Sequence, residues 1–236
     1  MQYAYNYFEQ SIMKDSPRKE ILEEITHAIG KIELPHPVRV GIDGMSATGK
    51  TVLADELAEL LQEHGKKVIR AGLDGFHNPP EIRHRQGSMS VEGYMEDSFD
   101  YPAVREKILK PLGPGGNRWY SPEIFDHQKG ESVKPVLREA SVDSILLFEG
   151  VMLLREELMD FFDFRILVIC SEKVILERAK IRDLEHFGNL ETLLEKYEHR
   201  FIPGQKKHLE ENRPERTAHL LFFNDDPEKP KLRKPR

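Results

Sequence analysis

Residues 41–57, GIDGMSATGKTVLADEL, decide the fold class of this chain. Residues 44–51 within this stretch fit the pattern G-x-x-x-x-G-K-[ST] at every fixed position. Glycines in such a loop let backbone N–H groups turn around phosphate oxygens, and the helix that follows points its positive end at the same anion. The loop is therefore predicted to bind phosphates.

The context of this loop favours phosphate binding over an ordinary glycine-rich turn. A short apolar strand at 38–43 precedes it, and an amphipathic helix from Lys50 to about Gly65 follows. Lys50 is expected to neutralise terminal phosphate oxygens, and the Thr51 hydroxyl to ligate Mg²⁺. The ATP-binding residues expected from the loop are Gly44, Ser46, Ala47, Thr48, Gly49, Lys50 and Thr51.

Strands and helices alternate along the rest of the chain. Strands are expected at 38–43, 66–74, 144–150, 164–170 and 219–223, and the main helices at 17–30, 50–65, 171–187 and 190–209. Five short apolar strands separated by helices predict the α/β class. We expect a P-loop NTPase-like three-layer sandwich with a mostly parallel five-stranded sheet and helices on both faces.

The chain is expected to form one domain over residues 1–227. Residues 75–144 are irregular but rich in aromatics, which predicts a functional insertion that binds an acceptor. Residues 178–213 are expected to form a lid-like region. The Pro-rich, basic segment 228–236 is predicted to be a disordered tail.

Two carboxylates end neighbouring strands. Because ligands bind at the carboxyl ends of parallel strands, Glu149 and Asp74 are expected beside the phosphate loop. Glu149 is predicted to hold Mg²⁺, although a strand-end carboxylate also caps turns. Asp74 is predicted to accept the proton of an acceptor hydroxyl, although an Asp-Gly pair also forms turns.

Arg178 and Arg182 lie four residues apart on one predicted helix face. Two guanidiniums there could clamp phosphate charge. The alternative is a solvated face paired with Glu177 and Glu185. Arg182 is the stronger candidate for a role in catalysis.

Composition bounds the function class. The chain has 236 residues, 39% of them hydrophobic, and a net charge of −6, which predicts a globular protein without a nucleic-acid partner. No segment approaches the ~18 apolar residues that span a bilayer, and residues 1–10 do not read as a signal peptide, so a cytoplasmic location is expected. Cys170 is expected to be a buried, inert thiol. A homo-oligomer remains open, and alternating Tyr3, Tyr5 and Tyr7 suggest a docked or frayed terminus.

Seven motifs occur in the order found in uridine kinase-like proteins, which belong to the phosphoribulokinase, uridine kinase and pantothenate kinase group of P-loop kinases. They are VGIDGMSATGKT, LDGFHNP, VEGYMEDSFDYPAV, PLGPGGNRWYSPEIFDH, LLFEGVMLL, ERAKIRD and YEHRFIPGQKKHLEENRPERTAHLLFFNDDP. The resemblance runs from about Arg18 to Pro227. It implies a sheet in 2-3-1-4-5 order, and transfer of the γ-phosphate of ATP, with Mg²⁺, to the 5′-hydroxyl of uridine or cytidine.

The resemblance also assigns roles to residues. It makes Asp74 the catalytic base and Arg182 the arginine of the lid helix, and it places the 224–227 loop, with Asn224 and Asp225, at the adenine of ATP. Lys50 is expected to act with them in catalysis, and Arg178, the other arginine of the predicted clamp, to bind ATP. The acceptor-binding residues expected are Phe76, His77, Tyr94, Phe99, Asp100, Phe125, Asp126 and His127. The lid sequence LEHFGN lacks further arginines, so lid closure is expected either to use Arg200, Arg213 or Arg216 or to be weaker.

Two other functions fit the same residues. One is a kinase of another small hydroxyl compound, such as pantothenate or a sugar. The other is a regulatory P-loop protein that hydrolyses ATP slowly. Asp74 and the aromatic insertion argue against a regulator, which needs switch loops but no small-molecule pocket.

Overall fold

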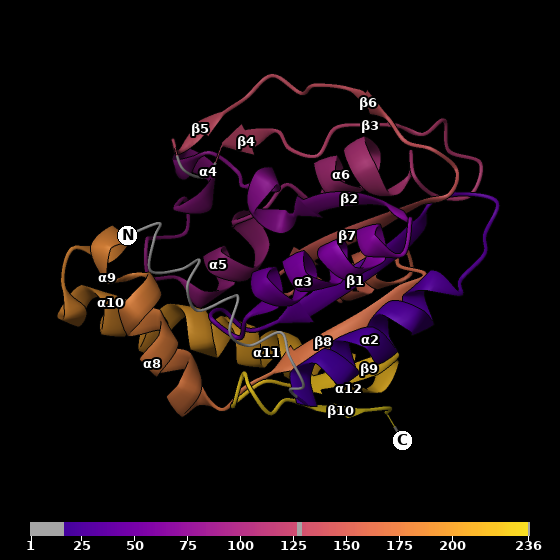
Figure 1. Ribbon diagram of the computed structural model, residues 1–236. Coiled ribbons are helices and arrows are strands. Elements are labelled where there is room, and N and C mark those ends of the chain that lie inside the picture. Colours follow the sequence, from indigo (N-terminus) through magenta and orange to yellow (C-terminus); the bar gives the residue numbers. More distant parts are fainter. Residues whose placement is uncertain (1–16, 127–128, 236) are drawn as a thin grey trace.

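A parallel sheet forms the centre of the molecule. The computed structural model describes residues 17–126 and 129–235 (Figure 1). The parallel strands are β1 (Val38–Gly44), β2 (Lys67–Gly72), β7 (Ser144–Gly150), β8 (Phe164–Ile169) and β9 (Leu220–Phe223). Their order across the sheet is β2-β7-β1-β8-β9, so the expected 2-3-1-4-5 order is confirmed.

A sixth strand, β10 (Lys231–Arg233), pairs antiparallel with the edge strand β9. Its register places Leu232 opposite Phe222, and the Arg233 guanidinium lies 5.2 Å from the ring centroid of Phe223. The prediction of a disordered tail was wrong for these residues. The free edge of β9 offers backbone donors and acceptors that a short segment satisfies whatever its composition.

Helices α2 (Pro17–Gly30) and α3 (Lys50–Glu63) cover one face of the sheet (Figure 1). Ile25 and Leu57 are fully buried there, in one cluster with Val40 and Ile42 of β1. Helix α2 has the bounds expected from Pro17 and Gly30, while its expected cap, Ser16, and the tyrosines of the N-terminus lie outside the described residues.

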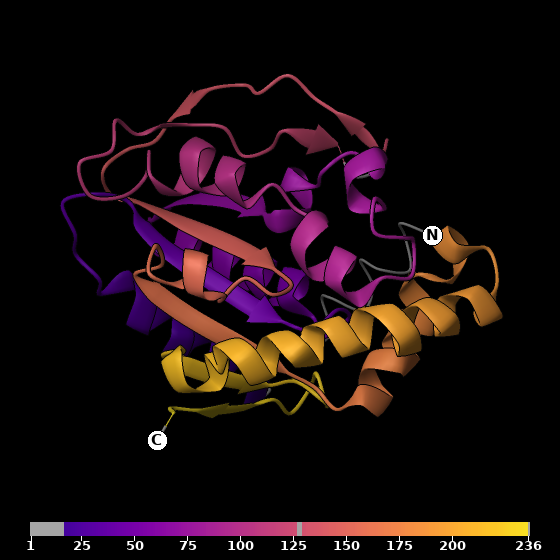
Figure 2. The same ribbon diagram turned by 180° about the vertical axis from the view of Figure 1, so that it is seen from behind.

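The opposite face of the sheet carries the third layer. It is covered by α5 (Val91–Asp97), α6 (Tyr101–Val104), the π-helical turn η2 (Arg105–Leu109) and α11 (Ile202–Asn212), which crosses it in Figure 2. Leu146, Phe148 and Leu167 point to this side and are buried in a second cluster. Because successive strand residues face opposite sides, the two clusters confirm the three-layer sandwich.

The C-terminal helices are less regular than expected. The helix predicted over 171–187 is two: α8 (Glu172–Arg182) and α9 (Leu184–Phe187), separated at Asp183. The helix predicted over 190–209 consists of α10 (Leu190–Lys196), the π-helical turn η3 (Tyr197–Phe201) and α11. Two short helices, α7 (Glu156–Met159) and α12 (Pro214–Thr217), complete this half. In the described parts of the chain, no helix is long and apolar enough to span a bilayer.

The 75–144 insertion is more regular than its letters suggest. It contains α4 (Pro80–Arg83) and two small strand pairs, above the sheet in Figure 1. The pairs are β3 (Trp119–Tyr120) with β6 (Arg138–Glu139), and β4 (Phe125–Asp126) with β5 (Glu131–Ser132). Its aromatic residues Tyr94, Phe99 and Tyr101 join the second core cluster. The insertion is therefore packed onto the sheet through its aromatics.

Candidate active site

The predicted phosphate loop connects β1 to α3 in a conformation that needs glycine. Gly49 caps α3 with φ 93° and ψ 24°, and a Cβ there would lie 2.7 Å from Asn224 Nδ2. A Cβ on Gly44 would lie 2.4 Å from the backbone oxygen of Val168. Ala47 also has a positive φ of 59°, which only the structure reveals. The loop has the tight turn that phosphate binding requires.

Lys50 lies inside this loop. Its side chain is buried, and Nζ donates a hydrogen bond to the Met45 carbonyl at 3.0 Å. Burial lowers the pKa of Lys50, and the charges of Glu149, Asp43 and Asp74 oppose that shift. The amino group is therefore near three carboxylates, at the position where the sequence predicted phosphate contact.

The two predicted metal ligands lie side by side. Thr51 Oγ1 donates a hydrogen bond to Glu149 Oε1 at 3.1 Å. Burial raises the pKa of Glu149, and so does the charge of Asp74, while Lys50 opposes the shift. Within residues 17–126 and 129–235, no group of three or more His, Cys, Asp or Glu residues could hold a metal by itself. A hydroxyl beside a carboxylate still fits Mg²⁺, which in kinases binds few protein ligands and completes its shell with phosphates and water.

Asp74 lies in η1 (Leu73–Phe76), directly after β2. Its carboxylate is 65% exposed, and its charge acts on both Lys50 and Glu149. His77 Nδ1 contacts the Asp74 backbone oxygen at 2.9 Å and lies 3.9 Å from Oδ1. The predicted base is thus accessible and near the phosphate loop.

Arg182 is tied to the end of its own helix. Its Nε and Nη2 donate to Asp183 at 2.6 and 2.9 Å, and Nη2 also donates to Tyr197 Oη at 3.3 Å. The hydrogen bond with Asp183 raises the pKa of Arg182. Its charge is among those that act on Lys50. A clamp on transferred phosphate stays a prediction, and it requires Arg182 to exchange this partner.

Arg178 stabilises the phosphate loop through hydrogen bonds to backbone oxygens. Its Nη1 donates to the Thr48 backbone oxygen at 3.3 Å and its Nη2 to the Asn224 backbone oxygen at 2.7 Å. Asn224 Nδ2 donates to the same Thr48 oxygen at 2.7 Å, and Asp225 Oδ1 accepts from Ser171 N at 2.7 Å. Of these predicted ATP-binding residues, Arg178 and Asn224 support the loop through the Thr48 carbonyl, and Asp225 binds the start of α8 at Ser171.

Cys170 contacts two of these residues, Asn224 and Arg178. Its Sγ donates to the Asn224 backbone oxygen at 3.2 Å and lies 3.3 Å from Arg178 Nη1. Burial raises the pKa of the Cys170 thiol. Cys170 is only partly buried, which corrects the burial expected for it. A thiol that resists deprotonation is a poor nucleophile, in line with the inert role expected for it.

The acceptor residues predicted from the insertion divide into two groups. His77, Phe99 and Phe125 form an aromatic group, with the His77 ring 4.5 Å from Phe99 and 5.9 Å from Phe125. Phe76, in contrast, is fully buried against Phe148, with centroids 6.0 Å apart. The structure corrects its assignment: Phe76 belongs to the core, since its side chain exposes no surface to a ligand. Phe99 and Phe125 are nearly as buried, at 3% and 1% exposed, so the exposed surface of the aromatic group is that of His77.

The predicted acidic acceptor residues have local partners. Asp100 Oδ1 accepts from Ala103 N at 2.8 Å and so caps α6. Asp126 accepts from Lys129 N at 3.0 Å, and Lys129 Nζ lies 3.1 Å from its Oδ2. His127 lies outside the described residues. Acceptor contact through these acids stays a prediction.

Gln205 of α11 reaches the phosphate loop and was not predicted. Its Oε1 accepts from Ser46 N at 2.8 Å, and its Nε2 donates to Ser46 Oγ at 2.9 Å and to Tyr94 Oη at 2.6 Å. Burial raises the pKa of Tyr94 to about 12. Gln205 joins the predicted acceptor residue Tyr94 to a backbone N–H of the loop.

A second contact from α11 supports the strand below the loop. Asp43 Oδ2 contacts His208 Nε2 at 3.0 Å and accepts from Leu154 N at 2.9 Å, and His208 Nδ1 contacts Asn212 Nδ2 at 3.1 Å. Burial alone would raise the pKa of Asp43, but His208 and the backbone donors hold it below its usual value. Gln205, His208 and Asn212 recur at helical spacing, so a polar stripe on one helix face was the signal in the sequence.

Replacement of His208 by alanine is expected to destabilise the protein. The carboxylate of Asp43 would stay buried with its side-chain partner removed, which costs about 3 kcal/mol of unfolding free energy. Urea unfolding measures the loss. His64→Ala is the control, because His64 is half exposed and 3.8 Å from Glu23; it should change stability by less than about 0.5 kcal/mol. Equal effects of the two variants would contradict a special role for His208.

A hollow of about 660 Å³ lies at the other end of β1, lined by Arg39, Lys110 and the 113–117 loop. Arg39 is engaged there in an ion pair with Asp163 at 2.9 Å. The predicted catalytic side chains follow the opposite end of this strand. We therefore place the candidate site at the phosphate loop.

The fold and these groups define a P-loop kinase. Residues 39–215 match the family described as Phosphoribulokinase / Uridine kinase family, and the chain belongs to that family. It is 30% identical to uridine-cytidine kinase B of Dictyostelium discoideum over 69% of this chain and 65% of that protein. It is 29% identical to a pantothenate kinase of Rhodopseudomonas palustris over 62% of this chain and 49% of that protein.

The chain thus spans about two thirds or less of these relatives. A structure titled a possible uridine kinase from Bacillus stearothermophilus superimposes with a TM-score of 0.69, at 20% identity. The superposition covers 86% of this chain and 97% of that one. It supports the fold.

Proposed function

We propose that this protein is an ATP-dependent kinase that transfers the γ-phosphate of ATP to a hydroxyl of a small acceptor. The observation that carries the proposal is the meeting of Lys50, the Thr51–Glu149 pair and the exposed Asp74 at one end of the sheet. A pure nucleotide switch has no need of an accessible carboxylate beside an aromatic group. The 5′-hydroxyl of uridine or cytidine is the first acceptor to test, because relatives are named for it.

The chain's own residues divide the work. Backbone N–H groups of the loop and Lys50 hold the phosphates and neutralise charge on the transferred group. Thr51 and Glu149 would hold Mg²⁺, which supplies further neutralisation when bound. Asp74 orients the acceptor hydroxyl and accepts its proton. Most of the rate enhancement then comes from positioning and charge, as in other phosphoryl transfers.

The aromatic group beside Asp74 offers an acceptor ring a contact mainly through His77. The His77 side chain is 11% exposed next to the base, and Phe99 and Phe125, at 3% and 1% exposed, pack behind it and fix its position. Pantothenate or a sugar is the second candidate, supported by the similarity to a pantothenate kinase. The cytoplasmic location and the lack of a nucleic-acid partner stay predictions.

The test is a panel of acceptors. The protein is incubated with Mg-ATP and nucleosides, pantothenate or sugars, and ADP release is followed. We expect at least one acceptor to raise ADP release above the rate in buffer. If uridine and cytidine give no more ADP than buffer, the nucleoside assignment fails. If no acceptor raises ADP release above the rate in buffer, the proposal of a kinase for these acceptors fails.

A further inference from the structure

We propose that the acceptor carries an oxyanion, a phosphate or a carboxylate, and that Arg83 and Arg200 bind it at the acceptor end of the site. The inference rests on the proposed kinase function and names the substrate class. Arg83 ends α4, and Arg200 lies in η3, so the two come from the insertion and from the lid-like region. They are more than a hundred residues apart in the sequence, and the fold brings them near enough for the charge of Arg83 to act on Arg200.

Arg200 is buried and Arg83 is partly buried, and each has a buried Nε atom without a partner. Arg200 is 7% exposed, and the Nε atoms of Arg83 and Arg200 have no hydrogen-bond partner among the residues that the structure describes. Instead, Arg200 lies over the Tyr94 ring at 5.3 Å and Arg83 over the Phe125 ring at 5.5 Å. Buried donors are almost always satisfied, so these two point to a missing acceptor of hydrogen bonds.

The charges around the pair leave it positive. Burial lowers the pKa of Arg200 and of Arg83, and the charge of Arg83 adds to the effect on Arg200. His84 and Lys196 are close as well, since the charges of Arg200, Arg83 and Lys196 all act on His84. The acids beside the group are Glu81, which acts on Arg83, and Glu195, which acts on Lys196. Placing several cations together in a partly buried site costs electrostatic free energy, and a bound oxyanion offsets that cost.

Lys196 is already engaged, because its Nζ donates to the Ser88 backbone oxygen at 2.7 Å. This bond ties α10 to the loop before α5, and so holds the lid-like region against the insertion. The bond joins the segments next to Arg200 and Arg83. Their guanidiniums have the fork geometry that matches phosphate and carboxylate oxygens.

The pair lies on the acceptor side of Asp74. Phe125, under Arg83, is in the aromatic group with His77, whose Nδ1 contacts the Asp74 backbone. Tyr94, under Arg200, is acted on by the charges of both Arg200 and Asp74. An acceptor whose hydroxyl reaches Asp74 can thus extend an anionic group toward these arginines.

The nucleotide phosphates are a less suitable occupant. The charges that act most on Lys50, which marks the phosphate position, are Glu149, Asp43, Asp74 and Arg182. Arg200 is governed instead by Tyr94 and Arg83. Arg182 is therefore the arginine whose charge acts on Lys50, and the proposal assigns Arg83 and Arg200 to the acceptor.

The experiment compares matched acceptors that differ only in the anionic group. The pairs are uridine 3′-monophosphate with uridine, pantothenate with pantothenol, glycerate with glycerol, and ribose 5-phosphate with ribose. Each keeps a free hydroxyl, and ADP release with Mg-ATP gives kcat/KM. We expect a charged member to exceed its neutral partner by about tenfold or more, the worth of a hydrogen bond between charged groups. The phosphate and carboxylate pairs separate the two sources of the oxyanion.

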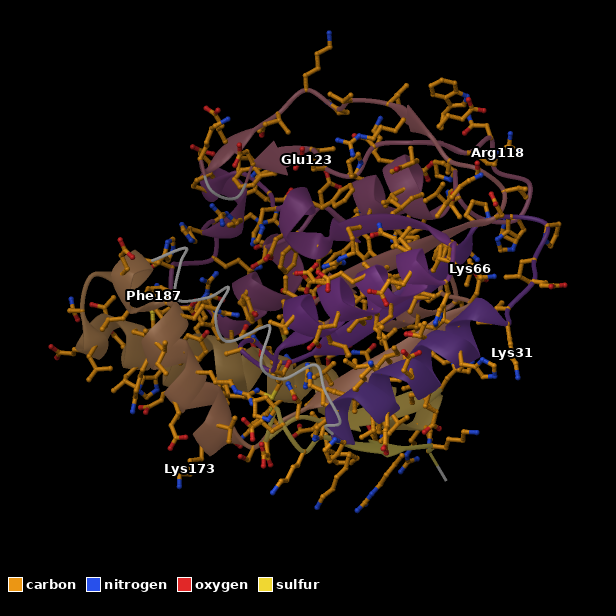
Figure 3. The ribbon with its side chains drawn as sticks, in the orientation of Figure 1. Lys31, Lys66, Arg118, Glu123, Lys173 and Phe187 are labelled. Atoms are coloured by element: carbon orange, nitrogen blue, oxygen red, sulfur yellow. The ribbon has the colours of Figure 1, made fainter. Side chains whose placement is uncertain are left out.

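Variants then assign the effect. Arg83→Gln and Arg200→Gln should each raise the KM for the charged acceptor about tenfold, with the KM for Mg-ATP within about twofold. Lys173→Gln removes a charge that projects into solvent from α8 in Figure 3, and should change neither constant. Arg200→Lys should restore part of the affinity, which a merely structural role would not predict. A rise in the KM for Mg-ATP alone would make the pair a nucleotide clamp and overturn the proposal.

If no acceptor on the panel reacts, that result counts against the proposed function alone. A binding measurement then tests the oxyanion site by itself. Inorganic sulfate is titrated into protein saturated with Mg-ADP, and the thermal unfolding midpoint is followed. We expect sulfate to raise the midpoint of the wild-type protein and not that of the Arg83→Gln/Arg200→Gln double variant. Equal rises in the two proteins, or neutral acceptors that match their charged partners, would refute the oxyanion site.

Discussion

Replacement of Lys50 by alanine is expected to lower kcat at least about a hundredfold, or about 3 kcal/mol of transition-state stabilisation. The reason is that the amino group lies inside the phosphate loop, where its charge is little screened by water. ADP release at saturating Mg-ATP and acceptor measures the effect. Circular dichroism checks that the loop's loss of the Met45 contact leaves the fold intact.

A lysine elsewhere provides the comparison. Lys173→Ala removes the same charge from an exposed position on α8 and should leave turnover unchanged. Near-normal turnover of the Lys50 variant would overturn the assignment of the 44–51 loop to phosphate binding. Loss of turnover in both variants would point to net charge rather than to position.

Asp74→Asn is expected to reduce phosphoryl transfer by about 10²–10⁴-fold, the usual worth of a general base. The amide has nearly the shape of the carboxylate but cannot accept the acceptor's proton. ATP affinity should stay within about twofold, because Asp74 is 65% exposed and its predicted contact is with the acceptor. Stopped assays of ADP release and equilibrium binding of a fluorescent ATP analogue measure the two quantities.

Asp143→Asn is a matched control, since the Asp143 carboxylate is 64% exposed and paired with Lys67 away from the loop. It should leave transfer and ATP affinity unchanged. If Asp74→Asn instead abolishes ATP binding, Asp74 is a metal or structural residue and another group must serve as base. Retained transfer in that variant would also exclude the base role.

Much of the site follows from local patterns in the sequence. The loop 44–51 is short, and the apolar strand before it and helix after it can be read from neighbouring letters. Placing Glu149 and Asp74 beside it required only the rule that parallel strands present their carboxyl ends together. The pairing of Thr51 with Glu149 agrees with that prediction.

Other predictions were wrong or incomplete where tertiary partners decide. Phe76 has the aromatic character of a ligand contact, but Phe148 from β7 encloses it. Segment 228–236 has a disordered composition, yet the open edge of β9 pairs with β10. A strand distant in the sequence supplied the partner of Phe76, and the preceding strand β9 supplied that of the tail; composition carries no record of either pairing.

The sequence by itself determined the fold class, the order of the parallel strands through its resemblance to a known group, and the phosphate loop. The tertiary structure alone decided which side chains serve that loop from a distance. Gln205 reaches Ser46, and His208 reaches Asp43, across 159 and 165 residues of chain. It also decided that Arg83 lies over Phe125 and Arg200 over Tyr94. The physical reason is that strand, turn and helix preferences act between near neighbours, whereas hydrogen bonds and charges act between whichever groups the packed sheet and helices bring together.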